Sequence, residues 1–446
     1  MKTPIHDFVK SYVNSDTLRL HMPGHKGVSL LGCETSDITE ITGADSLYHA
    51  DGIILESENY ASELFGSRHT YYSTEGSSLC IRAILYLIKR MSAANGSSPR
   101  ILAGRNAHKT FITAAALLDV DVDWIYTHNG SYLSCPIDPD LLDSVLSSYK
   151  EKPTAVYVTS PDYLGNVADI GGIAKVCRAH GVILAVDNAH GAYLKFLAES
   201  THPIDLGAHI CCDSAHKTLP VLTGGAYMHI SKDAPELFSR EARNALSIFG
   251  STSPSYLILQ SLDLANKYIS GELDKKLGAF ISEVNALKDR LLSVGYKLCG
   301  NEPLKLTVSA REFGYTGGGL ASEISIRGGE CEFADPDVTV MMLSPQMGIE
   351  GLSRLELILK DIERNDPLPR PLNGSVHPQR MISPREALFS EYEELPIDAC
   401  LGRIQASVSV SCPPAVPIVI CGELIDENAI EAFKYYGITT CLVIKN

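Results

Sequence analysis

The 446-residue sequence lacks long apolar runs, although 45% of its residues are hydrophobic. No stretch reaches the roughly 18 consecutive apolar residues that a membrane-spanning helix requires. The first segment, Met1 to Leu20, carries Asp7 and Asp16 where a signal peptide would have an uninterrupted apolar stretch. These absences predict a soluble cytoplasmic protein with no membrane partner.

Positive charge is also scarce. Lysine and arginine together number 38, against 53 aspartate and glutamate residues, so the formal net charge is -15. This balance argues against a nucleic-acid partner and mildly favours cationic ligands.

The 12 cysteines include no CxxC pair, and Cys211 and Cys212 are directly adjacent. Structural zinc sites and redox dithiols use spaced cysteine pairs. We therefore expect most of the cysteines to be buried thiols, and we predict no metal site.

Periodicity divides the chain into four predicted parts. Residues 1–55, dense in His, Gly and Pro, show no sustained period and are predicted to form an extended N-terminal arm. Residues 56–265 alternate short apolar runs with helical patterns, which predicts an α/β domain with a mostly parallel sheet. Residues 266–365 are predicted to form a smaller α+β domain. The C-terminal segment, residues 366–446, begins with a Pro-rich connection at 366–380.

Six apolar runs are the predicted strands of the large domain: Ile101–Ala103, Val122–Tyr126, Ala155–Val158, Val182–Val186, Ile210–Cys212 and Ala226–Ile230. Between them, residues 170–180 place apolar side chains at helical spacing, which predicts a crossover helix with a buried face. A longer helical pattern, residues 254–296, is broken near Gly271. It leads to predicted strands at 304–308 and 338–343.

The segment Asp213-Ser214-Ala215-His216-Lys217-Thr218 carries the strongest chemical signal, because it follows a predicted strand directly. A lysine that forms an imine must lie near a carbonyl in a dry polar site. Pyridoxal phosphate also needs an acid that keeps its pyridine nitrogen protonated, and Asp187 ends the preceding strand, where ligands of α/β sheets bind. Taken singly, Lys217 could be a surface charge and Asp187 a capping residue. Their combination favours a cofactor site.

A candidate phosphate site lies at Thr74–Ser78, which opens a helical pattern. Hydroxyls and backbone N–H groups at a helix start bind phosphate, which makes Gly76, Ser77 and Ser78 candidates. The same residue types are common helix caps. His108 follows the strand at 101–103, so it could stack on a planar cofactor or serve as a structural hydrogen-bonding group.

Taken in order, these motifs resemble the small, wing-less form of the ornithine/lysine/arginine decarboxylases over nearly the whole chain. The motifs are His21–Gly27, Asp37–Ile53, Glu63–Tyr71, Arg105–Lys109, Asp187–Gly191, Ser214–Pro220, Thr252–Tyr256, and Pro413-Pro414 with Gly422-Glu423. The resemblance implies a pyridoxal-phosphate-dependent enzyme with the aspartate aminotransferase fold (fold type I). Its large domain would hold a mostly parallel sheet, and a smaller α+β domain would follow.

The resemblance also implies roles for individual residues. Lys217 would be the Schiff-base lysine, Asp187 would bind the pyridine nitrogen and His108 would stack on the ring. The residues around the phosphate would be Gly76, Ser77, Ser78, Ser214 and His216, and Ala189 and His190 would lie near the ring. A homodimer would place the active site at its interface, with Ser251–Ser255 or the N-terminal arm reaching into the neighbouring site.

The sequence departs from the family pattern at several positions. Glu75 stands where Asn is usual, Asn188 where Glu is common and Gly224 where Gln is often found. Glu75 would bring a negative charge close to a phosphate unless its side chain points away. The Pro-Pro motif continues with Ala415-Val416, without the usual Gly.

The predicted reaction is decarboxylation of arginine, lysine or ornithine, which yields carbon dioxide and a polyamine-type amine. Glu423, Asp45 and Asp51 are candidates for binding the distal cation of the substrate, although surface solvation also explains each of them. One or two methylene groups change pocket binding by only about 1 to 3 kcal/mol, so the sequence does not choose among the three amino acids. Two alternatives stay open: another fold type I enzyme, such as an aminotransferase or a β- or γ-lyase, and a family member that has lost catalysis and serves in binding or regulation.

Overall fold

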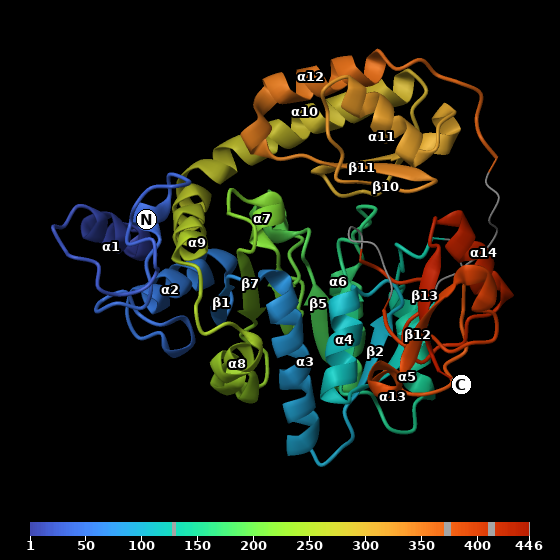
Figure 1. Cartoon of the computed structure of the whole chain (residues 1–446), viewed down its shortest axis with the longest axis horizontal. Helices are drawn as coiled ribbons and strands as arrows, with labels where there is room; N and C mark the ends of the chain where they lie inside the picture. The colour runs from blue at the N-terminus through green and yellow to red at the C-terminus, as the bar shows by residue number, and fades with distance from the viewer. Residues whose placement is uncertain (127–130, 370–375, 409–414, 446) are drawn as a thin grey trace. The chain divides into compact units, whose positions relative to one another are not determined.

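The protein consists of two compact units in which short strands alternate with helices (Figure 1). The computed structural model describes residues 1–126, 131–369, 376–408 and 415–445. The first unit comprises Met1–Ser97 and Ile170–Gly278, and the second comprises Ser98–Asp169 and Ala279–Asn446. Within the described ranges, every helix is too short or too polar to span a bilayer.

The first unit holds four strands in the order β1-β7-β6-β5. Their bounds are His69–Ser73 (β1), Ala226–Ile230 (β7), Ile210–Asp213 (β6) and Ile183–Asp187 (β5). β5 and β6 run parallel, whereas β7 is antiparallel to both β6 and β1. Every residue of β6 and β7 is buried, as expected for strands inside an α/β unit.

Helices cover these strands within the first unit. α3 (Gly76–Ala94) packs against β1, β6, β7 and α8 (Glu236–Phe249). α6 (Ile170–His180) packs against β5 and buries Ile170, Ile173, Ala174 and Cys177, which confirms the predicted crossover helix. The apolar faces of these helices are therefore buried in the same core as the strands.

The N-terminal arm is not extended throughout, which corrects a prediction. Helix α1 (Pro4–Val13) packs against α2 (Ile53–Phe65) and α9 (Tyr256–Tyr268). Its apolar residues Ile5, Phe8, Val9 and Tyr12 stand at helical spacing, and Ile5 and Val9 are buried. The sequence therefore carried a helix signal, confined to one ten-residue helix in an otherwise aperiodic segment. The described residues between α1 and α2 then form two short turns of helix, Glu34–Ser36 and Leu47–His49.

The second unit contains three parallel strands in the order β4-β2-β3. Their bounds are Arg100–Gly104 (β2), Asp121–Ile125 (β3) and Ala155–Thr159 (β4), and the helices between them are α4 (Lys109–Leu118) and α5 (Pro139–Ser148). With β5, β6 and β7, these strands account for all six apolar runs that were predicted as strands. The strand prediction is thus confirmed to within a residue or two at each end.

A separate antiparallel sheet follows, in the order β10-β11-β9-β8. Its strands are Leu298–Cys299 (β8), Lys305–Ser309 (β9), Phe333–Ala334 (β10) and Val338–Met342 (β11), with helices α11 (Gly317–Ile326) and α12 (Gly348–Lys360). The long helical pattern before it forms α9, a π-helical turn at Ile269–Leu273 and α10 (Asp274–Ser293). The predicted break near Gly271 is therefore confirmed.

The end of the chain forms a small core of its own. Its elements are α13 (Pro384–Phe389), β12 (Tyr392–Pro396), α14 (Glu427–Tyr435) and β13 (Thr440–Ile444), and β12 and β13 pair antiparallel. Ile425, Phe433 and Val443 lie in one buried apolar cluster. The middle of the Pro-rich connection, residues 370–375, lies outside the described residues, and the domain boundaries expected from the sequence stay a prediction.

Candidate active site

Lys217 lies on a single turn of helix, α7 (Ala215–Thr218), with only Ser214 between that turn and the end of β6. Its Nζ atom is 3.0 Å from Nε2 of His190. His190 comes from the loop after β5 and is 5% exposed. A hydrogen bond between two nitrogens needs one donor and one acceptor, so a Lys217 ammonium would donate to a neutral His190 ring. The lysine amine is thus held close to a group that can accept its proton.

Asp187 ends β5 and is 3% exposed. In the parallel pair of β5 with β6, it lies opposite Cys212, one residue before Asp213. Its Oδ1 accepts a hydrogen bond from the backbone N–H of Ala189 at 3.2 Å. The carboxylate of Asp187 and the loop that carries Lys217 therefore emerge from the same edge of two adjacent strands, where ligands of open α/β sheets bind.

Two of the predicted phosphate ligands meet although they are far apart in sequence. The Ser214 hydroxyl donates a hydrogen bond to the Ser77 hydroxyl at 2.8 Å. Ser77 lies in the first turn of α3, a 19-residue helix whose N-terminal N–H groups carry partial positive charge. Ser78 lies in the same turn. Gly76 opens the turn with a positive φ of 69°, and a Cβ atom there would meet no atom within 4 Å.

These donors fit pyridoxal phosphate. A pair of hydroxyls at the start of a long helix suits a phosphate group, the Lys217 amine can react with an aldehyde, and the buried Asp187 carboxylate can pair with a pyridinium nitrogen. His216, beside Lys217, is fixed by a hydrogen bond of 3.0 Å between its Nδ1 and the Gly225 carbonyl oxygen.

The glycine at 224, one of the departures from the family pattern, is required by the backbone. Gly224 has a φ of 98°, and a Cβ atom there would lie 2.9 Å from the carbonyl oxygen of Thr74. Its own carbonyl oxygen accepts the backbone N–H of Gly76 at 2.7 Å. A glutamine at 224 would therefore clash with the loop that leads into the start of α3.

The Glu75 carboxylate has a partner of its own. Its Oε1 accepts the backbone N–H of Ser251 at 2.6 Å. Ser251 begins the Ser251–Ser255 segment that was expected to reach into a neighbouring site. The hydrogen bond directs the negative charge of Glu75 toward this segment.

Asn188 is fully buried, and its Nδ2 donates to Oδ1 of Asp213 at 2.7 Å. Oδ2 of the same carboxylate lies 3.1 Å from Nε2 of His202 and 3.1 Å from Nε2 of His229. Burial alone would raise the pKa of Asp213, but the two histidines hold that pKa well below its ordinary value. A glutamate at 188 would set a second carboxylate against Asp213, so the neutral amide suits this position.

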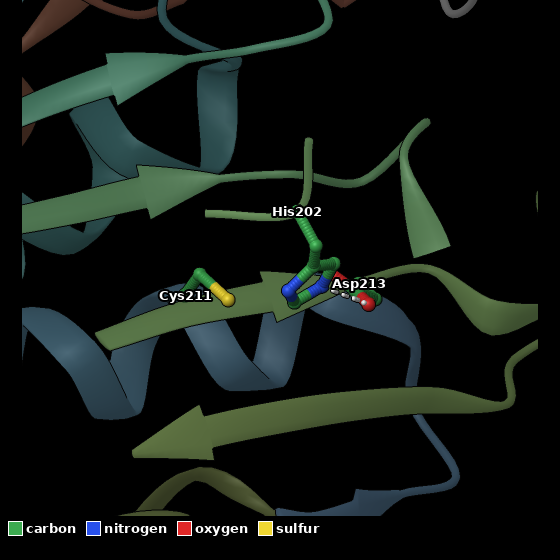
Figure 2. Close-up of side chains that lie close together, drawn as sticks. All are labelled: His202, Cys211 and Asp213. Atoms are coloured by element: carbon green, nitrogen blue, oxygen red, sulfur yellow. Dashed lines mark hydrogen bonds and ion pairs between the residues drawn. The ribbon is translucent and has the colours of Figure 1, made fainter. Parts of the chain in front are cut away.

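Figure 2 shows the His202 ring directed at the Asp213 carboxylate, with the Cys211 sulfur on the same strand. The ligand atoms of His202, Cys211 and Asp213 lie within 4.8 Å of one another, a spacing that could hold a metal ion. Burial raises the pKa of the Cys211 thiol well above its ordinary value. The absence of a metal site stays a prediction.

His108 and Glu423 belong to the second unit, and both side chains have partners there. His108 is the N-cap of α4, and its Nδ1 accepts the backbone N–H of Thr110 at 3.1 Å. Glu423 is 2% exposed, and its Oε2 accepts from Nη2 of Arg105 at 3.0 Å and from the backbone N–H of Ile420 at 2.8 Å. Burial raises the pKa of Glu423, and the Arg105 guanidinium opposes that shift.

Asp45, a candidate for substrate binding, carries out a structural task at the start of α2. Its carboxylate oxygens accept backbone N–H groups from Ser46, Asp51, Gly52, Ile54 and Leu55. Asp51 itself is exposed.

Pro413 and Pro414, the first part of the C-terminal motif, lie outside the described residues.

The sequence alone attached no role to Asp213, His202 or His229. The position of Asp213 could have indicated a role in the site, because Asp213 ends a strand directly before the Ser-x-His-Lys motif. Asp187 ends the preceding strand in the same way. No such indication existed for the two histidines: His202 lies in a loop and His229 inside β7, and only the fold brings them together at 0% exposure.

Comparison with known proteins supports the family resemblance. Residues 3–307 match the major domain of the Orn/Lys/Arg decarboxylases, and residues 375–441 match their C-terminal domain. The arginine decarboxylase of Bacillus subtilis is 27% identical over 97% of this chain and 93% of its own length. The arginine decarboxylase of Halalkalibacterium halodurans is 27% identical over 96% of this chain and 92% of its own length.

The fold is also similar to that of a solved enzyme. The lysine decarboxylase of Francisella novicida superposes with a TM-score of 0.80 at 16% identity, over 99% of this chain and 81% of the other. At this identity the likeness concerns the fold alone. It confirms the predicted fold type I architecture, with a mostly parallel sheet and a smaller domain that carries an antiparallel sheet.

Gly224→Ala should lower the free energy of unfolding by about 2 to 5 kcal/mol, because strain from a positive φ adds to a clash with Thr74. Gly96→Ala is the matched control, since Gly96 has a φ of 67° and a Cβ atom there would point into open space. The control should cost only about 1 kcal/mol. Denaturant unfolding measures both, and equal losses would contradict the clash at 224.

Proposed function

Since the chain belongs to the Orn/Lys/Arg decarboxylase family, we propose that it removes carbon dioxide from a basic amino acid with pyridoxal phosphate held on Lys217. One observation carries this proposal: Lys217 and Asp187 follow adjacent parallel strands, and the Ser214–Ser77 hydroxyl pair lies at the start of a long helix beside them. Family membership makes the chain an amino-acid decarboxylase. The substrate and the residue roles are parts of the proposal.

Each residue of the site would have one task. Lys217 would hold the cofactor covalently, and Ser77, Ser214 and the N–H groups at the start of α3 would bind its phosphate. Asp187 would bind the ring nitrogen and keep its proton in place. Bound pyridoxal phosphate supplies an electron sink for the charge left on the substrate carbon when carbon dioxide departs.

Proton handling at Nζ of Lys217 would fall to His190. The 3.0 Å contact between Nε2 of His190 and Nζ of Lys217 supports this role, since His190 could then take a proton from the ammonium and return it. A lysine must lose its proton before it can act as a nucleophile. The neutral form of the His190 ring is the form that accepts the proton. His108, which caps α4, stays a candidate for stacking on the ring.

Arginine is the first substrate to test, because two relatives matched over more than nine-tenths of their length are named arginine decarboxylase. The similar solved structure is named lysine decarboxylase. The formal net charge of -15 is compatible with a cationic substrate. The amine product would enter polyamine metabolism, and the enzyme would act as a cytoplasmic homodimer with its active sites at the interface.

Lys217→Ala should abolish both the visible absorbance band of the cofactor-loaded protein and carbon dioxide release, because no other residue replaces the covalent lysine. Lys232→Ala, on an exposed lysine of the same unit, is the matched control and should behave like the wild type. Spectra of both variants are followed by carbon dioxide release with arginine, lysine and ornithine.

A wild-type band without carbon dioxide release from any of the three amino acids would contradict the substrate proposal. Amino exchange that depends on a keto acid would then identify an aminotransferase. Absence of the band in the wild type would contradict the cofactor proposal and favour a binding or regulatory protein.

Asp187→Ala should lower kcat by about 100- to 1000-fold, with a much smaller change in KM, because the buried carboxylate would stabilise charge that develops during the reaction. Asp233→Ala removes an exposed carboxylate from the same unit and serves as the control. Steady-state kinetics on the substrate identified above provide the measurement. A rise in KM at constant kcat would assign Asp187 to binding alone.

Glu423→Gln tests the proposed partner of the substrate's distal cation. If Glu423 binds that cation, KM should rise about 10- to 100-fold, the equivalent of a lost charge-assisted hydrogen bond of about 1.5 to 3 kcal/mol. If Glu423 only pairs with Arg105, the free energy of unfolding should fall while KM stays constant. Kinetics and denaturant unfolding on the same preparation separate the two roles.

A further inference from the structure

Asp213 is a fully buried carboxylate surrounded by three nitrogen donors. Nδ2 of Asn188 lies 2.7 Å from Oδ1, and Nε2 of His202 and Nε2 of His229 each lie 3.1 Å from Oδ2. All four side chains have 0% exposure. A buried anion with no water around it is costly unless each of its oxygens accepts hydrogen bonds, and here both do.

The contacts of the Nδ1 atoms of His202 and His229 indicate which ring nitrogen faces Asp213 as a donor. Nδ1 of His202 faces the backbone N–H of Ile204 at 3.4 Å, so it must accept, and Nε2 must carry the hydrogen. Nδ1 of His229 lies 2.8 Å from the Thr70 hydroxyl, which can donate to it. Both rings can therefore donate through Nε2 to one oxygen of the carboxylate, and the Asn188 amide donates to the other.

Asp213 connects the two loops that carry the proposed catalytic groups. Asn188 directly follows Asp187, and Asp213 directly precedes Ser214 in the segment that leads to Lys217. The Cα pairing of β5 with β6 ends at Asp187 and Cys212, and the backbone N–H of Asn188 still donates to the Cys212 carbonyl oxygen at 2.9 Å. The bond from Asn188 to Asp213 thus adds one side-chain link beyond the last Cα pair, at the edge where the cofactor would lie.

The surroundings keep this link in one orientation. The side chain of Asn188 occupies the space beside Gly191, where a Cβ atom would lie 2.0 Å from Oδ1 of Asn188. On the other side of Asp213, the His229 ring packs against Phe65 with ring centroids 4.4 Å apart. Close packing of this kind leaves little room for either side chain to turn.

We propose that Asp213 is a positioning residue: through Asn188 on one side and Ser214 on the other, it sets the spacing between Asp187 and Lys217. This inference rests on the proposed function, because those two residues are the proposed catalytic pair. Asp213 would thus influence the catalytic geometry although it would touch neither cofactor nor substrate. Small displacements of reacting groups have large kinetic effects, which is why such a link matters.

Asn188→Asp should break the link, because it sets two carboxylates against each other. We expect kcat to fall on the order of 10- to 100-fold, with a smaller change in KM and an altered visible spectrum of the cofactor-loaded enzyme. Adding Asp213→Asn to this variant should restore most of the lost kcat and the wild-type spectrum. In the double variant, the new amide at 213 can donate to the new carboxylate at 188, and its oxygen can still accept from both histidines.

Asp263→Ala is the matched control. Asp263 is another fully buried carboxylate of the first unit, and it accepts hydrogen bonds from the Ser57 hydroxyl at 2.6 Å and the backbone N–H of His6 at 3.0 Å. Both of these partners lie outside the proposed site. Loss of the Asp263 carboxylate should lower the free energy of unfolding and leave the spectrum and kcat of the folded enzyme unchanged.

A further readout is independent of the cofactor. The rate at which an amine-specific reagent labels Lys217 in the cofactor-free full-length protein, followed by mass spectrometry of its peptide, should change in Asn188→Asp and recover in the double variant. This readout judges the inference even where the proposed function fails, since that failure appears separately as a wild-type protein without the visible band or without carbon dioxide release.

Three outcomes would overturn the inference. The first is an Asn188→Asp variant that is less stable but keeps wild-type kcat, spectrum and labelling rate, as the Asp263→Ala control should. The second is a double variant that recovers none of the loss. The third is a stoichiometric metal ion in the purified wild-type enzyme that is lost in His202→Ala, which would make Asp213 a metal ligand instead.

Discussion

The parallel pairing of β5 with β6 is the constraint on which the rest of the site depends. It aligns the carboxyl ends of two strands, so the residues that follow them must share one edge. Asp187 ends one strand, and Lys217 follows the other after a single turn of helix. The long helix α3 packs against β6 and brings its N-terminal turn to Ser214. Three chemically different groups are thereby placed by one strand pair and one helix.

Two carboxylates at this edge of β5 and β6 are shielded from bulk water. Asp187 and Asp213 are both buried, in strand positions that are nearly adjacent across the pair. The three nitrogen donors around Asp213 are buried side chains of the fold itself, so its charge is stabilised whether or not a ligand is bound. That arrangement suits a structural role for Asp213. Asp187, whose Oδ1 is oriented by the Ala189 N–H, is the carboxylate proposed to meet a protonated ring nitrogen.

The sequence predicted most of the strands and the local order of this site, because apolar runs and motif spacing are local properties. Lys217, Asp187 and Ser77 could be named from strand ends and a helix start. The contacts of His202 and His229 could not, since they come from a loop and a strand interior that meet only after folding. Helix α1 was missed although Ile5, Phe8, Val9 and Tyr12 stand at helical spacing, because this pattern covers only one short helix in an arm that is otherwise aperiodic.

The departures from the family pattern bear directly on whether catalysis has lapsed. Three of the four have a local physical reason: Gly224 avoids the Thr74 backbone, Glu75 binds the Ser251 N–H and Asn188 donates to Asp213. A chain that had lost its function would be free to lose these complementary contacts as well. Instead these three positions are matched to their neighbours near the edge that carries Lys217 and Asp187. This matching favours a working site with altered supporting residues over a lapsed one, and it makes Asn188 and Asp213 the pair whose exchange is most informative.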